Sequence, residues 1–168
     1  MKTFLSVILL MLCMVARAAD DQAKQKNELP ASALEILEGA ETLILVSVDF
    51  RKEERDETKF FHGFQTLGEI EVKNAAERKE LLAALRKGVE ENQDTGAKCF
   101  VPRHGIRATF KGKSVDLVIC FECMWVYVYE SDQKRRILMT SDSPQPVFDK
   151  LLKAAKVPLA PKPGEEKK

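Results

Sequence analysis

The sequence predicts a single α+β domain in which an antiparallel sheet carries its helices on one face, as a two-layer sandwich. Three observations lead to this prediction. The chain has 168 residues, which is enough for one hydrophobic core. Stretches rich in β-branched residues alternate with stretches whose apolar residues recur at helical spacing. These stretches follow the order helix, two strands, helix, three strands, helix, with no internal repeat.

The first 18 residues have the features of an export signal. Lys2 precedes an apolar run from Phe4 to Val15, and Ala16-Arg17-Ala18 supplies the small residues that a signal peptidase reads. We therefore expect cleavage after Ala18 and export to the periplasm or out of the cell. The apolar run is too short to cross a membrane as a helix, so no membrane insertion is expected after cleavage.

Polar segments are expected to flank the domain. Residues 19–28 and 159–168 lack apolar periodicity and are predicted to be a flexible start and a disordered tail, which leaves 29–158 for the fold. The chain has 27 Lys and Arg against 26 Asp and Glu. This balance argues against nucleic acid as a partner, because a nucleic-acid-binding domain needs an excess of basic side chains.

The first half of the domain predicts two helices around a hairpin. A short helix is expected over residues 32–38, and the β-branched run 42–50 predicts a strand. A second, irregular strand at 60–72 is expected to pair with the first. Asn74 has the character of a helix N-cap, and apolar residues at helical spacing continue from there to Val89.

The second half predicts three strands and a helix. A strand over 106–110 leads through a tight turn at 111–113 into the apolar run 115–129. That run is far longer than the average strand of about 5–6 residues, so we expect a bend or bulge at its Cys-Phe-Glu-Cys segment. A short strand follows at 137–140, and Ser143 is predicted to cap the last helix.

Four soft donor side chains form the main functional signal. After signal removal, three cysteines remain, Cys99, Cys120 and Cys123, and His104 lies between the first two. In a hairpin that turns at 111–113, His104 lies opposite residues 119–121 and Cys99 falls just beyond the partner of Cys123. All four donors then meet at one end of the hairpin. Thiolate and imidazole are ligands of zinc, so the pattern predicts a structural or binding zinc site, with cuprous copper as the softer alternative.

The same residues leave two other interpretations open. In an unbroken strand Cys120 and Cys123 point to opposite faces, so any shared chemistry requires a local turn at Phe121-Glu122. With such a turn, the CxxC motif is also a candidate thiol-disulfide pair, with Cys99 as a resolving or third thiol. The last interpretation is a non-catalytic interaction module whose cysteines are buried or joined by a disulfide.

Further side chains near the motif have less specific patterns. Arg103 and Arg107 flank His104 and are candidates for binding a small anion. Trp125, Tyr127 and Tyr129 recur at every second residue, which is typical of one face of a strand. No hydrolase or phosphoryl-transfer motif is present in the sequence, so we assign no catalytic residue.

The strings CFVPRHGIR and VDLVICFEC, followed by SDSPQPVFDKLLKAAKVPLAP, resemble a group of exported bacterial proteins of uncharacterised function. The shared pattern is Cys-Phe-x-Pro-Arg-His-Gly followed by Cys-Phe-x-Cys, within about the last seventy residues. The resemblance implies an exported bacterial protein and carries no activity.

Overall fold

The computed structural model describes residues 26–51, 59–92, 96–131, 135–162 and 164. The expected export signal lies outside the described residues. The helices are α2 (Ala31–Glu38), α3 (Ala75–Glu91) and α4 (Gln145–Ala154). The strands are β1 (Thr42–Asp49), β2 (Phe60–Phe61), β3 (Phe64–Glu71), β4 (His104–Phe110), β5 (Lys113–Cys120), β6 (Trp125–Glu130) and β7 (Arg136–Met139).

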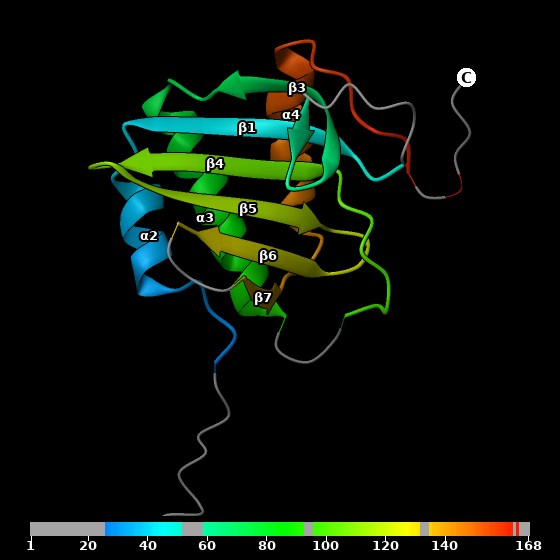
Figure 1. The fold of residues 1–168 in the computed structure, drawn as a ribbon, viewed down its shortest axis with the longest axis horizontal. Helices are drawn as coiled ribbons and strands as arrows, with labels where there is room; N and C mark the ends of the chain where they lie inside the picture. The colour runs from blue at the N-terminus through cyan, green and yellow to red at the C-terminus, as the bar shows by residue number, and fades with distance from the viewer. Residues whose placement is uncertain (1–25, 52–58, 93–95, 132–134, 163, 165–168) are drawn as a thin grey trace, which may run out of the picture.

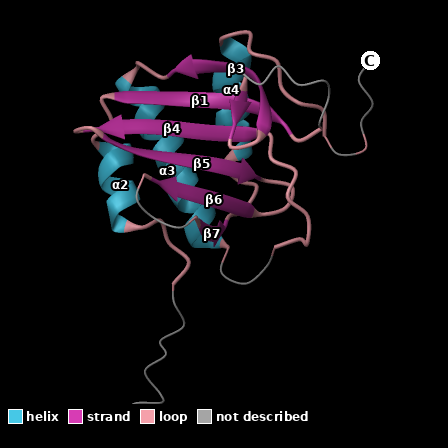
Figure 2. Cartoon of the chain, in the orientation of Figure 1, coloured by secondary structure: helices cyan, strands magenta, loops and turns pink. Residues whose placement is uncertain are grey.

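The seven strands form one antiparallel sheet in the order β2-β3-β1-β4-β5-β6-β7. All three helices lie behind this sheet in Figure 1, and Figure 2 shows the same division between strands and helices. The α+β class is therefore confirmed. The sheet is curled like half a barrel, so the flat layers of a two-layer sandwich are not confirmed.

The main core fills the space between the sheet and the helices. Leu45, Ile106 and Leu117 project from neighbouring strands into this space and are fully buried. Leu85 of α3 and Phe148 of α4 meet them there. Since burying one such side chain stabilises a fold by about 1.5–3 kcal/mol, this cluster holds the helices against the sheet.

A second, smaller apolar cluster lies on the other face of the sheet. Val46, Val48 and Val118 project from the central strands, and Phe61 of β2 packs over them. Both faces of the central strands are covered, which explains why apolar residues in β1 and β5 do not alternate strictly with polar ones.

The apolar run 115–129 forms two strands, so its prediction as one strand is wrong. Phe121–Met124 is a turn, and Met124 takes up the left-handed conformation with φ of 61°. The Met124 N–H donates to the Phe121 carbonyl at 3.3 Å, and β6 then returns antiparallel to β5. The bend expected at Cys-Phe-Glu-Cys is thus confirmed as a complete chain reversal. The turn contains no glycine or proline, the residues that usually mark a chain reversal in a sequence.

Two helix starts that look alike in the sequence differ in the structure. The Asn74 side chain caps α3 by accepting the N–H groups of Ala76 and Glu77 at 2.8 and 3.2 Å. The N-cap of α4 is Pro144, and Ser143 makes no cap bond. The Ser143 hydroxyl instead donates to the Glu91 carboxylate at 2.8 Å, so its prediction as a cap is wrong.

Packing extends slightly beyond the 29–158 range that the sequence predicts. Asn27 is buried, and its amide donates to the carbonyls of Val89, Asn92 and Met139. Ala160 is buried at the other end of the chain. Among the described residues, no helix has the length and apolar character needed to cross a membrane.

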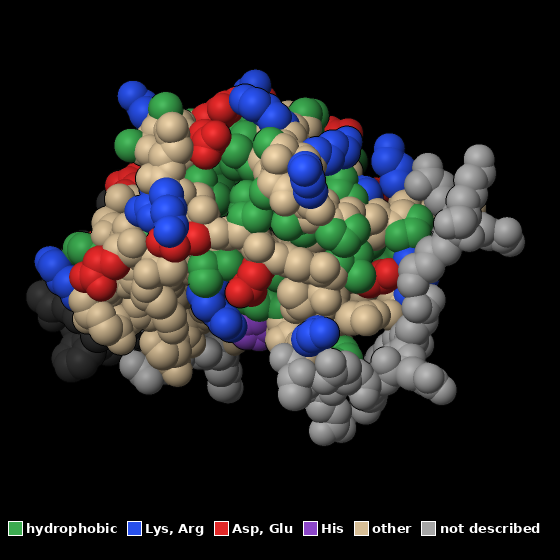
Figure 3. Space-filling view, turned by 90° about the horizontal axis from the view of Figure 1, so that it is seen from above, with side chains coloured by type: hydrophobic (Ala, Val, Ile, Leu, Met, Phe, Trp, Pro, Cys, Tyr) green, Lys and Arg blue, Asp and Glu red, His purple; other side chains and the backbone are tan. Residues whose placement is uncertain are grey.

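Charged side chains of both signs are spread over the surface. Figure 3 views the molecule from above, where β3 and α4 are uppermost, and shows Lys, Arg, Asp and Glu mixed with hydrophobic side chains. This view agrees with the near balance of basic and acidic residues in the sequence. No single sign of charge dominates this side of the molecule.

Candidate thiol site

The three cysteines come together where β5 turns into β6. Cys120 ends β5, and Cys123 lies in the turn that follows. The segment before β4 is bonded to this turn, because the Ala97 N–H donates to the Cys123 carbonyl at 3.0 Å and the Trp125 indole N–H donates to the Ala97 carbonyl at 2.6 Å. These bonds bring Cys99 to the turn from a distant part of the sequence.

Cys123 contacts both other cysteines. Its Sγ lies 2.8 Å from the Cys99 Sγ, and its backbone N–H donates to the Cys120 Sγ at 3.1 Å. All three are free cysteines; Cys99 is exposed, whereas Cys120 and Cys123 are completely buried. The site therefore has one sulfur open to solvent and two beneath it.

Burial sets the protonation of the two inner thiols. It raises the pKa of Cys120, although the Cys123 thiol and the backbone N–H groups of Val101 and Cys123 oppose the shift by bonding to its sulfur. Burial, followed by the neighbouring thiols of Cys120 and Cys99, raises the pKa of Cys123 well above its usual range. Both inner thiols are consequently protonated at neutral pH.

His104 lies on the other face of the sheet. It pairs with Ile119 in the register that the hairpin prediction includes, so both side chains share the helix-covered face. By the alternation of β5, Cys120 points to the opposite face. The structure therefore brings together the three predicted sulfur donors and leaves the predicted imidazole donor outside their cluster.

The His104 ring is part of the main core. It lies 5.2 Å from the Phe121 ring and 5.7 Å from the Phe148 ring, between centroids. Its Nε2 is 2.8 Å from the Asp149 carboxylate, and its buried Nδ1 has no hydrogen-bond partner. Burial lowers the pKa of His104 despite the opposing effect of Asp149, so the ring is neutral at neutral pH.

Within the ranges that the structure describes, no three His, Cys, Asp or Glu side chains form a group that could hold a metal ion. The predicted site of Cys99, His104, Cys120 and Cys123 is thus not assembled in this arrangement. Its zinc and copper assignments remain predictions.

The two arginines proposed for anion binding are both paired with carboxylates. Arg103 is buried, and its guanidinium donates to Glu122 at 2.7 Å and to the Ala160 carbonyl at 2.8 Å. Arg107 makes two bonds to Asp116, at 2.9 and 2.8 Å, which raise the pKa of Arg107. Arg103 thus ties together the motif, the turn and the C-terminal segment.

Other motif positions serve the packing around the thiols. The Phe100 ring stacks on Tyr127 with centroids 3.7 Å apart, which anchors the chain beside Cys99. A Cβ on Gly105 would lie 2.5 Å from the Phe61 ring, so only glycine admits this ring against β4. The sequence motif therefore combines three thiols with residues that hold their surroundings in place.

Two acidic residues at this end of the sheet were not selected from the sequence. Glu122 pairs with Arg103, and Asp149 pairs with His104. Glu122 lies inside the CxxC motif, so its position in the sequence could have identified it as a neighbour of the thiols. Asp149 is on a helix 45 residues from His104, and no local pattern links the two.

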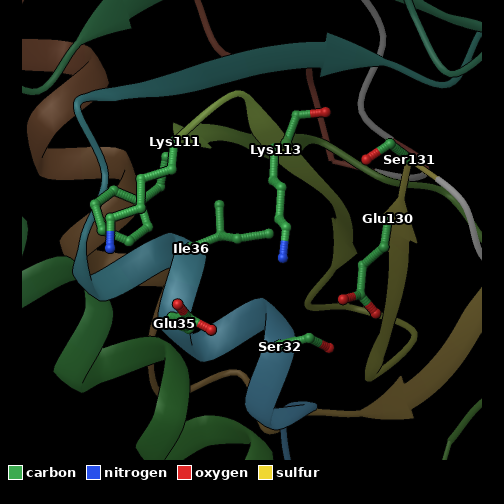
Figure 4. A pocket seen from close by; sticks show the side chains of 9 residues that line it. Ser32, Glu35, Ile36, Lys111, Lys113, Glu130 and Ser131 are labelled. Atoms are coloured by element: carbon green, nitrogen blue, oxygen red, sulfur yellow. The ribbon is translucent and has the colours of Figure 1, made fainter.

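A pocket at the opposite end of β5 contains none of the predicted site residues. Figure 4 shows Ser32 and Glu35 of α2 facing Lys111, Lys113 and Glu130 across it. Its lining mixes acidic and basic groups, and none of these three strand-side residues is buried. It offers no assembled set of donors comparable to the sulfur cluster.

No family model, curated protein or solved structure matches this chain. The candidate site therefore rests on its own geometry, and the resemblance of the motif to exported bacterial proteins stays a prediction.

Proposed function

We propose that the protein is a thiol-disulfide redox protein whose reacting pair is the exposed Cys99 and the buried Cys123. The distance of 2.8 Å between their sulfur atoms carries this proposal. A disulfide requires a separation of about 2.05 Å. Two thiolates bound tetrahedrally to one zinc ion at about 2.3 Å stand roughly 3.8 Å apart. At 2.8 Å the two sulfur atoms are close enough to form a disulfide without a rearrangement of the chain.

The unequal exposure of the two thiols suits this chemistry. The exposed Cys99 is accessible to a disulfide on another molecule, whereas the buried Cys123 is protected from it. The Cys99 thiolate attacks that disulfide, forming a mixed disulfide and releasing one thiolate. The Cys123 thiolate then attacks the Cys99 sulfur and releases the second thiolate. The protein loses two electrons and its two thiol protons, and the partner disulfide becomes a dithiol.

The proposal changes the pair that the CxxC pattern alone suggests. From the sequence, Cys120 and Cys123 form the redox pair and Cys99 is the resolving or third thiol. Cys120 is completely buried, so a partner cannot reach it without opening the fold. Export, which the sequence predicts, fits the proposal because disulfides persist in oxidising compartments.

The test isolates the pair in a chain that carries Cys13→Ser, so that only the three cysteines of the domain remain. In the additional variant Cys120→Ser, we expect a reversible internal disulfide between Cys99 and Cys123 in glutathione redox buffers, detected by alkylation and peptide mass spectrometry. Its midpoint should lie in the range of redox proteins, about −120 to −270 mV. The matched variant Cys123→Ser should form no internal disulfide.

Two results would overturn the proposal. One is a Cys120→Ser variant that stays reduced at the oxidising end of this range. The other is a disulfide whose potential lies below about −300 mV, which is typical of structural bridges. The second result would favour the interaction module with structural cysteines.

A second candidate function is binding of a soft metal ion, zinc or copper. The specific observation is that Cys123 contacts two further sulfurs, Cys99 and Cys120. Metal content of reduced protein purified without chelator tests it by mass spectrometry. About one ion per chain, lost in Cys123→Ser and kept in His104→Gln, would support a site of three sulfurs. Loss in His104→Gln as well would support the four-donor site predicted from the sequence, and absence of metal after reconstitution would exclude both.

A further inference from the structure

The sulfur of Cys123 is the shared neighbour of an outer and an inner cysteine. The exposed Cys99 lies 2.8 Å from this sulfur, and the buried Cys120 is hydrogen-bonded both to the Cys123 thiol and, at 3.1 Å, to the Cys123 N–H. The turn at residues 121–124 is what brings the two ends of the CxxC motif together. Cys123 is therefore placed to join a disulfide with either neighbour.

We propose that the disulfide moves inward, from Cys99–Cys123 to Cys120–Cys123, and that Cys120 is the residue that drives this transfer. The inference rests on the proposed redox function and adds a third reacting residue to it. The outcome is a chain that stores its oxidised state in a buried disulfide and presents Cys99 again as a free thiol.

The transfer balances without another reactant. The Cys120 thiol gives its proton to water, and its thiolate attacks the Cys123 sulfur. The bond between the Cys99 and Cys123 sulfurs breaks, and its electron pair leaves on Cys99, which takes a proton from water. One disulfide is formed and one is broken, so the chain as a whole is neither oxidised nor reduced.

The surroundings of the two end states favour the inward direction. The departing Cys99 thiolate is in contact with solvent, whereas the outward step would expel a buried thiolate. The attacking sulfur of Cys120 accepts backbone N–H groups from Val101 and Cys123, which stabilise its thiolate as it forms. Glu122 is the charged side chain that acts against this thiolate, and its pairing with Arg103 partly neutralises that charge.

The inner disulfide would also be protected after transfer. Cys120 and Cys123 are both fully buried, so an external thiol cannot reach either sulfur directly. Reduction must proceed through Cys99, which attacks Cys123 and reverses the transfer. Both oxidation and reduction by an external partner then proceed through Cys99.

The experiment follows the location of the free thiol after one round of oxidation, in the Cys13→Ser background. The fully reduced chain is oxidised with one equivalent of a small disulfide, quenched at intervals, and labelled with a charged maleimide before peptide mass spectrometry. We expect labelling of Cys99 to fall and then recover to about one label per chain, as Cys120–Cys123 replaces Cys99–Cys123. The recovery should accelerate several-fold for each unit of pH between 7 and 8.5, because the thiolate is the attacking species.

Two variants separate this inference from the proposed function. Cys120→Ser should oxidise normally but never recover its Cys99 label, and Cys99→Ser should form Cys120–Cys123 only slowly because its accessible thiol is missing. If Cys120→Ser oxidises and the parent chain nevertheless keeps Cys99–Cys123, the transfer is refuted while the redox function stands. If Cys120→Ser does not oxidise, the redox function itself fails. The parent chain supplies the decisive reading even if a variant fails to fold.

Discussion

Cys123 and His104 belong to the same sequence motif but have very different surroundings. Cys123 contacts two thiols and lies in a turn between strands. His104 is fully buried on the opposite face of the sheet, bonded to Asp149 and enclosed by aromatic rings. The motif histidine thus supports packing between β4 and α4, whereas the motif cysteines are the groups to which we assign the proposed redox chemistry.

At the residue scale, His104 should make stability depend on acidity. Burial depresses the pKa of His104 in the folded state, so its contribution is full above about pH 6.5, the ordinary value, and is lost as pH falls through the folded pKa. The loss should approach about 1.4 kcal/mol per pH unit. Urea unfolding between pH 4.5 and 7.5, with the thiols kept reduced, measures it.

The variant His104→Gln serves as the comparison for this pH dependence. It should be less stable than the parent chain at pH 7, because it loses ring packing and the bond to Asp149. The difference between the two chains should narrow below pH 6.5. A difference that stays constant over the whole range would show that His104 does not titrate on unfolding.

At the scale of elements, the hairpin register was predictable and the chain reversal was not. The turn at 111–113 sets which residues of β4 and β5 face each other, and the observed pair His104 and Ile119 follows from it. The reversal at 121–124 uses Met124 in a left-handed conformation and has no glycine, so its local sequence continues to look like a strand. Only the unusual length of the apolar run indicated that the chain must bend there.

Contacts between side chains of different elements also could not be predicted from local sequence patterns. The cysteines were identified as a group because the hairpin places them at one end, and this placement is correct. Which of the four predicted donors are neighbours depends on the face of the sheet to which each side chain projects. His104 and Cys120 project to opposite faces, so His104 is not a neighbour of the thiols. The 96–99 segment is held against the turn by hydrogen bonds from the Ala97 N–H and the Trp125 indole N–H, and no sequence pattern predicts these bonds.

The starts of α3 and α4 allow a comparison of two variants, one that removes a helix cap and one that does not. Asn74→Ala should destabilise the protein by about 1 kcal/mol, because two N–H groups of α3 lose their acceptor. Ser143→Ala should change stability by no more than about 0.5 kcal/mol, because its exposed hydroxyl caps no helix. Chemical denaturation of both variants under identical conditions measures the pair. Equal losses would contradict the assignment of the two helix starts.

At the scale of the whole molecule, the thiols lie where three separate parts of the chain meet. The 96–103 segment, the turn between β5 and β6 and the segment after α4 are tied together by Arg103 and by the Ala97 bonds. A disulfide between Cys99 and Cys123 closes a loop of about 25 residues, which corresponds to roughly 3.5 kcal/mol in the chain-entropy description. In Cys120→Ser, where this disulfide cannot move inward, oxidation should therefore stabilise the fold as a whole.

The reduced molecule should lose stability in alkaline solution. The pKa values of Cys120 and Cys123 are raised in the folded state, so their contribution is full below the unfolded value of about 8.5 and is lost as pH rises above it. Unfolding of reduced and oxidised protein between pH 7 and 10 measures the effect. The reduced chain should weaken by up to about 1.4 kcal/mol per pH unit for each thiol. The oxidised chain should weaken less, and equal losses would contradict burial of the thiols.

The most direct test of the account is a disulfide count in two chains that differ only at Cys123. Both carry Cys13→Ser, both are equilibrated in oxidised glutathione buffer, and free thiols are counted by alkylation and intact mass. The account predicts that the parent chain reversibly forms one internal disulfide, and that Cys123→Ser forms none and instead holds glutathione on Cys99 as an unresolved mixed disulfide. A parent chain with three free thiols, or an internal disulfide in Cys123→Ser, would contradict the central role of Cys123.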